Sequence, residues 1–354
     1  MKIHLTLLFT LLTFSGFSQY NSPESMEYDF ANNRWLIANN SGNNILARSS
    51  SGVLSTFITG VTGPHGIEIV NDTLYVCSGS TLKAYRVSSA APVFSINLSA
   101  SFLNGITHDS TYLYITDFSA FKIYRFNMAT HSFSVFVTGL SKSPNGIIYD
   151  QPNNRCVFVS WGTAAPIMAF DVTSAAVSTV STTLLGNCDG ITKDGAGNYY
   201  ISSWSSNKIL RYNNTFTTGP ITVVSGLTNP ADIFYNLLND TLGVPNSGSL
   251  NNTAYYYFGV TSIGEIEKDL FKLSVNPNPV VTHAQISFTL PEKSVVTISL
   301  MDVNGSLVKM ISAETQAAGI HNQPIDFSEE SAGDYLLKMT INGKTETKKV
   351  VKIK

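Results

Sequence analysis

A short phrase recurs six times between residues 23 and 233, and this repeat restricts the possible folds more than any other feature of the sequence. Four copies share Gly-Ile at their third and fourth positions, and two degenerate copies keep only part of that pattern. The copies occupy residues 23–26, 64–67, 103–106, 144–147, 188–191 and 230–233, with successive spacings of 41, 39, 41, 44 and 42 residues. A period near 40 residues with three or four strands per unit is typical of a β-propeller. The sequence therefore predicts an all-β chain whose main domain, residues 20–258, is a six-bladed β-propeller.

The fifth unit shows the strand pattern most clearly. A short apolar strand at 190–193 is followed by the turn-forming sequence Asp-Gly-Ala-Gly-Asn at 194–198, and β-rich strands follow at 199–203 and 208–212. The sixth unit is the shortest and least regular, with strands expected at 240–244 and 255–258. Few residues lie between the expected signal-peptide cleavage site, near Ser18 or Gln19, and Glu24, so the sequence does not show which segment completes the last blade.

The N-terminus predicts export. Residues 1–19 contain an early lysine, Lys2, then an apolar run at 5–14 and small residues near Ser18, which together are typical of a secretory signal peptide. No later segment is apolar enough to form a transmembrane segment. The net charge is −2, and no run of basic residues is present, so nucleic acid is not an expected partner.

The three cysteines do not predict a disulfide framework. Cys77, Cys156 and Cys188 are odd in number and belong to different repeats. A domain of this size can form a core without disulfides. We therefore expect each cysteine to be a small buried core residue.

A second domain is predicted at residues 270–354, after a linker at 259–269. Apolar and polar residues alternate at 284–290, 295–302, 306–311, 333–341 and 345–353, which predicts strands. Asn-Gly pairs at 304–305 and 342–343 predict tight hairpin turns between them. The expected architecture is a small antiparallel β-sandwich.

Four motifs of this tail resemble the C-terminal sorting domain of proteins exported by the bacterial type IX secretion system. They are Asn-Pro-Asn-Pro at 276–279, Leu-Met-Asp-Val-Asn-Gly at 300–305, Gly-Asp-Tyr-Leu-Leu at 333–337 and the lysine-rich end at 348–354. The resemblance implies that the type IX machinery is a partner and that the protein is secreted or held at the cell surface, often after removal of the tail. A carbohydrate-binding or adhesive sandwich is the alternative.

The second residue of each phrase is the candidate site residue. The innermost strand of every blade lines the central channel, so equivalent positions converge at one mouth of that channel. Going round the ring, these residues are Glu24, His65, Asn104, Asn145, Asp189 and Ala231. Two carboxylates and two carboxamides are hard oxygen donors suited to Ca²⁺, or less specifically to Mg²⁺ or Mn²⁺.

At these positions the sequence resembles the six-bladed family of gluconolactonases, regucalcin (the senescence marker protein) and related calcium-dependent phosphotriesterases. Glu24 matches the family's early Glu, Asn145 its Pro-Asn-Gly phrase, and Asp189 its Asp-Gly phrase followed by Asp-x-x-Gly-Asn. The resemblance implies that Glu24, Asn145 and Asp189 hold the metal, with Asn104 as an additional Asn nearby. The sequence departs from the family at Glu24-Ser25-Met26, where the family has Glu-Gly-Pro.

Two functions remain open. The first is metal-assisted hydrolysis of a lactone or similar small ester, with Asp189 as general base and Asn104 and His65 at the substrate. The second is a non-catalytic surface propeller of the NHL type, which shares the Asp-Gly-x-Gly-Asn phrase and binds a glycan or protein. Alternatively, Asn104 and Asn145 are turn residues, and His65 is a neutral residue that lines the channel. Three further residues near the ends of second strands are candidates to rim the mouth: Trp161, Trp204 and Asp117. For the two tryptophans, packing in the core or between blades is the alternative.

Overall fold

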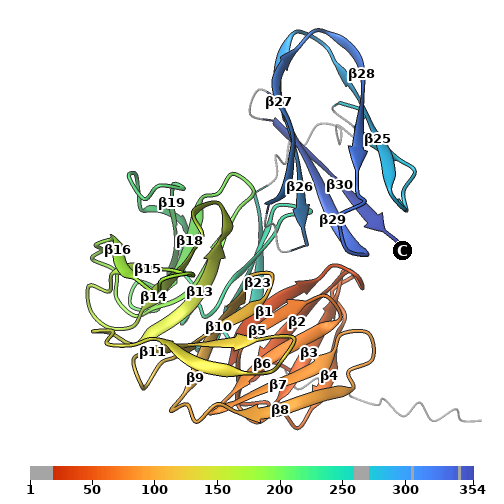
Figure 1. Ribbon diagram of the computed structural model, residues 1–354. Coiled ribbons are helices and arrows are strands. Elements are labelled where there is room, and N and C mark those ends of the chain that lie inside the picture. Colours follow the sequence, from red (N-terminus) through yellow and green to blue (C-terminus); the bar gives the residue numbers. More distant parts are fainter. Residues whose placement is uncertain (1–18, 259–270, 304–306, 342–343) are drawn as a thin grey trace, which may run out of the picture.

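A computed structural model describes residues 19–258, 271–303, 307–341 and 344–354. The described residues before 259 form six antiparallel sheets arranged as the blades of a propeller (Figure 1). Five repeat phrases begin an innermost strand, since β1, β5, β9, β13 and β17 start at Pro23, Pro64, Leu103, Pro144 and Cys188. The prediction of an all-β, six-bladed propeller is thus confirmed.

Each of the first five blades has four strands, in the order inner to outer. Blades 1 and 2 consist of β1 (Pro23–Asp29), β2 (Arg34–Asn39), β3 (Asn44–Ser49) and β4 (Leu54–Thr59), then β5 (Pro64–Val70), β6 (Thr73–Ser78), β7 (Thr81–Arg86) and β8 (Pro92–Asn97). Blades 3 and 4 consist of β9 (Leu103–His108), β10 (Tyr112–Asp117), β11 (Lys122–Asn127) and β12 (Phe133–Val137), then β13 (Pro144–Asp150), β14 (Arg155–Ser160), β15 (Ile167–Asp171) and β16 (Val177–Ser181). Blade 5 consists of β17 (Cys188–Lys193), β18 (Tyr199–Ser203), β19 (Lys208–Tyr212) and β20 (Ile221–Val224).

The sixth blade has three described strands, β21 (Phe234–Asn236), β22 (Thr241–Asn246) and β23 (Asn252–Tyr257). The expected strands at 240–244 and 255–258 overlap β22 and β23 but start at different residues. Side chains tie this blade to the N-terminal segment: Asn251 accepts the backbone N–H of Ser22 (2.8 Å) and donates to the carbonyl of Tyr20 (2.9 Å). These bonds, together with the backbone bond from Asp232 to Glu24 (2.9 Å), close the ring.

Glycine at the third position of the phrase has a steric cause. A Cβ on Gly105 would lie 2.4 Å from the carbonyl oxygen of Asn145, and one on Gly146 would lie 2.4 Å from that of Asp189. Neighbouring inner strands therefore approach more closely than any side chain allows. Farther out, apolar faces of adjacent blades pack together, as Leu36 and Val76 do between blades 1 and 2.

The C-terminal domain is a β-sandwich. One sheet contains β24 (Ser274–Asn276), β25 (His283–Leu290) and β28 (Gly319–Asp326), and the other contains β27 (Leu307–Gln316), β26 (Ser294–Asp302), β29 (Gly333–Ile341) and β30 (Lys344–Lys352). Its core includes Phe288, Ile298 and Leu337. The expected Asn-Gly turns at 304–305 and 342–343 include residues outside the described ranges. The short 3₁₀-helix η1 (Gln151–Asn153) lies in the propeller, and no helix in the described ranges is long and apolar enough to cross a membrane.

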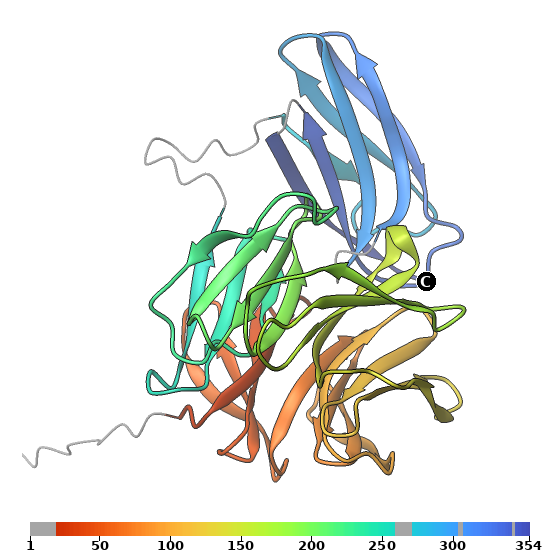
Figure 2. The same cartoon turned by 90° about the vertical axis from the view of Figure 1, so that its left-hand side faces the viewer.

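The two mouths of the channel differ in their surroundings. We call the face at which the inner strands begin the entry face, and the face at which they end the exit face. The sandwich stands against the exit face, where Lys338 of β29 donates to the carbonyl of Gly195 (Figures 1 and 2). The entry face is therefore left free of the C-terminal domain.

Candidate functional site

Five of the six predicted ring residues lie at the entry face because each follows the first residue of an inner strand, whereas Ala231 precedes β21. In blades 1 to 5 the pairing of inner and second strands shifts register at this point, for example between Pro23 and Ser25 and between Cys188 and Ile191. A β-bulge leaves residues unpaired and redirects their side chains. The repeated bulge thus explains how one phrase presents polar side chains at the same mouth.

Asn145 and Asp189 are the most deeply placed polar members of the ring, with 1% and 6% of their surface exposed. Asn145 donates its Nδ2 to the carbonyl of Cys188, 3.2 Å away on the next blade. Its Oδ1 is buried and has no hydrogen-bond partner among the described residues. A buried acceptor without a partner costs about 1–3 kcal/mol, so this oxygen marks a place where a ligand would be bound favourably.

Glu24 and Asp189 form an acidic pair in the ring. Its Oε1 accepts a hydrogen bond from Ser247 (2.6 Å), and burial raises the pKa of Glu24 to about 7 in spite of that bond. Burial also raises the pKa of Asp189 well above its usual range, and the charge of Glu24 raises it further. The two carboxylates are close enough to repel each other, and a bound cation would relieve this repulsion.

Asp232 is a site residue that the sequence interpretation missed. It follows Ala231, whose methyl side chain gives the ring no polar group in blade 6. Asp232 accepts a hydrogen bond from Ser25 (2.9 Å), and burial raises its pKa to about 7. The signal was present in the sequence, because Ser25 and Asp232 stand where the other four phrases have glycine.

His65 is held by its own blade and by blade 1. Its Nδ1 contacts the carbonyl of Gly63 (2.9 Å), and Asn40 approaches both ring nitrogens at 3.2 and 3.3 Å. Burial lowers the pKa of His65, which favours the neutral ring. Asn104 lies in β9 at the equivalent position of blade 3 and is half-buried. The structure thus joins Glu24, Asn145 and Asp189 electrostatically, and it places His65 and Asn104 on the adjoining blades.

Oxygen donors of the right type for a hard cation are therefore present. Two carboxylates and one carboxamide oxygen without a partner fit the ligand preference of Ca²⁺. In the described part of the chain, no group of three or more His, Cys, Asp or Glu side chains is arranged to hold a metal ion. Any cation here would depend on the carboxamide of Asn145 as well as on the acids.

Aromatic side chains form a continuous belt on the entry face across blades 2 to 5. The ring of His65 lies 4.5 Å from Phe102, Phe102 lies 5.9 Å from Phe118, Phe118 lies 5.9 Å from Trp161, and Trp161 lies 5.1 Å from Trp204. All five side chains are half-buried. The two tryptophans therefore pack against each other and also rim the mouth.

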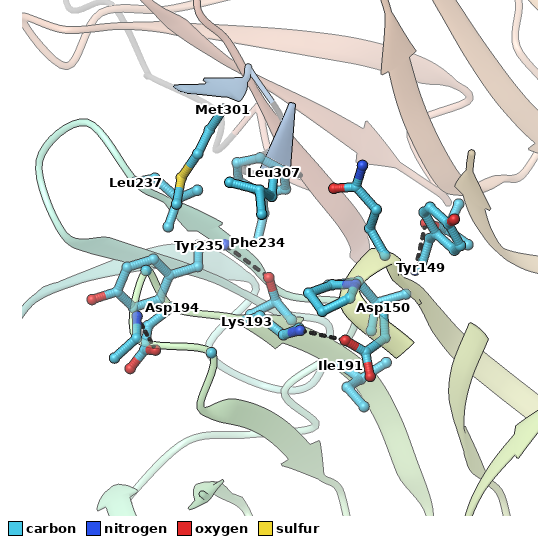
Figure 3. Close-up of a pocket in the computed structure, with 18 of the residues that line it drawn as sticks. Tyr149, Asp150, Ile191, Lys193, Asp194, Phe234, Tyr235, Leu237, Met301 and Leu307 are labelled. Carbon is cyan, nitrogen blue, oxygen red and sulfur yellow. Dashed lines mark hydrogen bonds and ion pairs between the residues drawn. The ribbon is translucent and has the colours of Figure 1, made fainter. Parts of the chain in front are cut away.

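The large cavity lies at the opposite side. It has a volume of about 760 Å³ and extends from the exit end of the channel into the gap between the exit face and the sandwich. Met301 and Leu307 of the sandwich line it there (Figure 3). Asp150 and Lys193 form an ion pair of 2.8 Å in its wall (Figure 3). Glu24, Asn145 and Asp189 do not line this cavity. Asp232 does line it, so the cavity extends to one of the buried acids of the candidate site.

The molecule is thus a six-bladed β-propeller with a C-terminal β-sandwich, and comparisons with known proteins agree with both parts. Residues 274–354 match the family model described as secretion system C-terminal sorting domain. The tail is therefore a sorting domain of this type, and its presence indicates export. A search of curated proteins found no match to the chain.

Solved structures share the propeller fold at low sequence identity. A calcium-binding protein, regucalcin, from Agrobacterium tumefaciens has a TM-score of 0.54 and 15% identity over 64% of this chain and 82% of its own. A gluconolactonase from Xanthomonas campestris has a TM-score of 0.55 and 12% identity over 64% of this chain and 84% of its own. A chain of a nidogen–laminin complex has a TM-score of 0.52 and 15% identity over 63% of this chain and 93% of its own. These similarities establish the fold alone, because the sequence identities are only 12% to 15%.

Proposed function

We propose that this protein is an exported, divalent-metal-dependent hydrolase of a lactone or similar small ester. The observation that carries the proposal is the unpartnered Oδ1 of Asn145, buried beside the carboxylates of Glu24 and Asp189. The gluconolactonase and regucalcin among the similar folds support it by analogy. Ca²⁺ is the proposed cation, with Mg²⁺ and Mn²⁺ as the alternatives.

Each residue has a role that follows from its contacts. Glu24, Asn145 and Asp189 would hold the cation, which when bound polarises a substrate carbonyl. Ser247 fixes the carboxylate of Glu24, and the Cys188 carbonyl fixes the carboxamide of Asn145. Asp189 would take a proton from the attacking water as general base, and a bound cation would favour the ionised form that this role needs. His65 and Asn104, on the adjoining blades, would contact the substrate.

The proposal also includes a route of export. Residues 1–19 would act as a signal peptide, and the sorting domain would engage the type IX machinery and bring the protein to the cell surface or the medium. The sandwich contacts the exit face, so the entry face is open whether or not the tail is removed (Figure 2).

A second candidate function is supported by the aromatic belt. The half-buried side chains of Phe118, Trp161 and Trp204 form a partly exposed aromatic surface, which suits stacking on the apolar faces of sugar rings. On this alternative the propeller binds a surface glycan or a protein without catalysis, and any cation is structural.

Calcium titration by calorimetry tests the primary proposal. The chain from residue 20 onward should bind Ca²⁺ stoichiometrically, and the double variant Glu24→Ala, Asp189→Ala should not. The single variant Asp189→Asn should lose hydrolysis of a panel of lactones. A folded wild-type protein that binds no divalent cation would contradict the hydrolase proposal, whereas glycan binding that survives Asp189→Asn would support the alternative.

A further inference from the structure

Lys338 of β29 reaches from the sandwich onto the exit face of the propeller. Its ammonium group donates to the carbonyl of Gly195, in the turn between β17 and β18 of blade 5. Burial in this position lowers the pKa of Lys338, whereas the charges of Asp194 and Asp240 act to raise it. Asp240 directly precedes β22 of blade 6. Opposite charges therefore hold one edge of the sandwich at blades 5 and 6.

Two further contacts join the sandwich to other blades. Burial lowers the pKa of His108, at the end of β9 in blade 3, but Glu68 and the charge of Asp302, at the end of β26, raise it overall. Val303, directly after β26, packs against the apolar cluster of blade 1 that includes Tyr28. Blades 1, 3 and 5 alternate in a ring of six. Contacts on all three therefore surround the exit mouth instead of touching it on one side.

The end of the sandwich that makes these contacts also forms a wall of the cavity of about 760 Å³. Met301 and Leu307 line the cavity from the sandwich (Figure 3), and Glu68 and His108 line it from the propeller. Nearer the entry face, the cavity is lined by the fourth residues of the six phrases, each at most 5% exposed: Met26, Ile67, Ile106, Ile147, Ile191 and Ile233. The sandwich therefore lies between this cavity and the surroundings of the exit face.

We propose that the C-terminal sorting domain acts as a cap on the exit mouth and keeps bulky molecules out of the channel cavity while it is docked. Its interface combines charged contacts with a small apolar one, and such mixed interfaces open more readily than large apolar ones. Release of the cap would expose Glu68 and His108 and open a second route toward Asp232. The inference does not depend on the proposed hydrolysis, whose site lies at the entry face.

A thiol in the cavity wall reports whether the cap is closed. Ile148 of β13 lines the cavity, so Ile148→Cys in the chain from residue 20 onward is the probe. Its rate of reaction with fluorescein maleimide, a bulky reagent, is compared with that of Ser51→Cys, in the exposed turn between β3 and β4. The native cysteines contribute little, because all three are fully buried: Cys77, Cys156 and Cys188. We expect the Ile148→Cys thiol to react at least about tenfold more slowly than the Ser51→Cys thiol.

Charge reversal at the interface should open the cap. Lys338→Glu brings a negative charge next to Asp194 and Asp240, and Lys338 is half-buried outside the core of the sandwich. A second variant combines Lys338→Glu with Val303→Asp and so removes two contacts. Lys293→Glu, in the exposed turn before β26, is the matched control. We expect the double variant to release the sandwich, seen as a larger radius of gyration by small-angle X-ray scattering, and to label Ile148→Cys at least about tenfold faster, with no change in the control.

Three results would overturn the proposal. A released sandwich with an unchanged labelling rate would show that the cavity stays closed without it. A double variant that remains compact would show that these contacts do not hold the sandwich in place. Equal rates for Ile148→Cys and Ser51→Cys in the otherwise unaltered chain would show that the exit mouth is open. Calcium titration of the same samples keeps this inference apart from the proposed function, because Lys338→Glu should bind Ca²⁺ as the wild type does.

Discussion

Asn145 donates its side-chain amide to the carbonyl oxygen of Cys188, 3.2 Å away on the neighbouring blade, and this bond leaves its Oδ1 buried without a partner. The contact links blades 4 and 5 at the point where Asp189 enters the channel. It fixes which end of the carboxamide faces the carboxylates. The acceptor at the mouth is therefore a consequence of how two blades meet.

Asn145→Ala should weaken Ca²⁺ binding by about tenfold or more, because it removes a neutral oxygen donor and the bond that orients it. The measurement is calorimetric titration, with thermal unfolding to follow stability. Asn236→Ala is the matched control, since Asn236 is also fully buried in an inner strand with an unpartnered side-chain atom but lies at the exit end of blade 6. Equal loss of Ca²⁺ affinity in both variants would contradict a direct role of Asn145.

The stability of the metal-free protein should depend on pH through Glu24. Burial raises its pKa from 4.5 to about 7, so the folded state holds the proton more tightly than the unfolded chain. The contribution of Glu24 to the free energy of unfolding is therefore fully present below about pH 4.5 and is lost as the pH rises through about 7. Relative to Glu24→Gln, the wild type should therefore lose free energy of unfolding across this range, by up to about 1.4 kcal/mol per pH unit.

Denaturant unfolding of the two proteins in parallel, with chelator present, measures this difference. Added Ca²⁺ should cancel it near pH 7, because the cation favours the ionised carboxylate. A difference that stays constant between pH values of about 4.5 and 7 would show that Glu24 does not titrate in this window.

Asp232→Asn should have opposite effects on stability and on metal affinity. The amide keeps an acceptor for Ser25 but removes a buried charge that raises the pKa of Asp189. We expect the metal-free protein to become more stable and Ca²⁺ to bind a few-fold more weakly, since less negative charge attracts it. Asp171→Asn is the control, because the side chain of Asp171 accepts its hydrogen bonds from Thr173 and Ser174 in its own exposed turn. Changes of the same sign in both quantities would contradict an electrostatic role.

Asn251→Ala should destabilise the propeller by about 0.5–1.5 kcal/mol, because two partly buried backbone groups lose their side-chain partner. Those groups, the N–H of Ser22 and the carbonyl of Tyr20, tie the N-terminal segment to the sixth blade. Asn213→Ala is the control, since Asn213 bonds only within its own loop. Urea unfolding compares them, and equal midpoints would show that the ring closes by other contacts.

Much of the architecture was predictable because it results from short sequence repeats. The four phrases that have glycine at their third position each begin an inner strand, and there the glycine permits close approach of the next blade. Strand β28 was not predicted. Its sequence contains Pro324 and several polar residues, and it is a strand because β25 pairs with it along its whole length.

The candidate site was predictable only in part. Glu24, Asn145 and Asp189 follow from their place in the phrase, since the period of the blades carries equivalent positions to one mouth. Asp232 interrupts that pattern, and only the seam between blades 6 and 1 reveals its partner, Ser25. The position of the Trp204 ring depends likewise on how it packs against Trp161 of the neighbouring blade.

The sequence by itself determined the number of blades, the sorting tail and the ring of polar residues, because each is encoded by short motifs at regular or terminal positions. Only the tertiary structure decided how the ring closes, which face the sandwich covers, and which polar atoms remain without partners. These features arise from contacts between residues far apart in the chain. Their geometry depends on how six separately encoded sheets pack around one axis, which no single motif specifies.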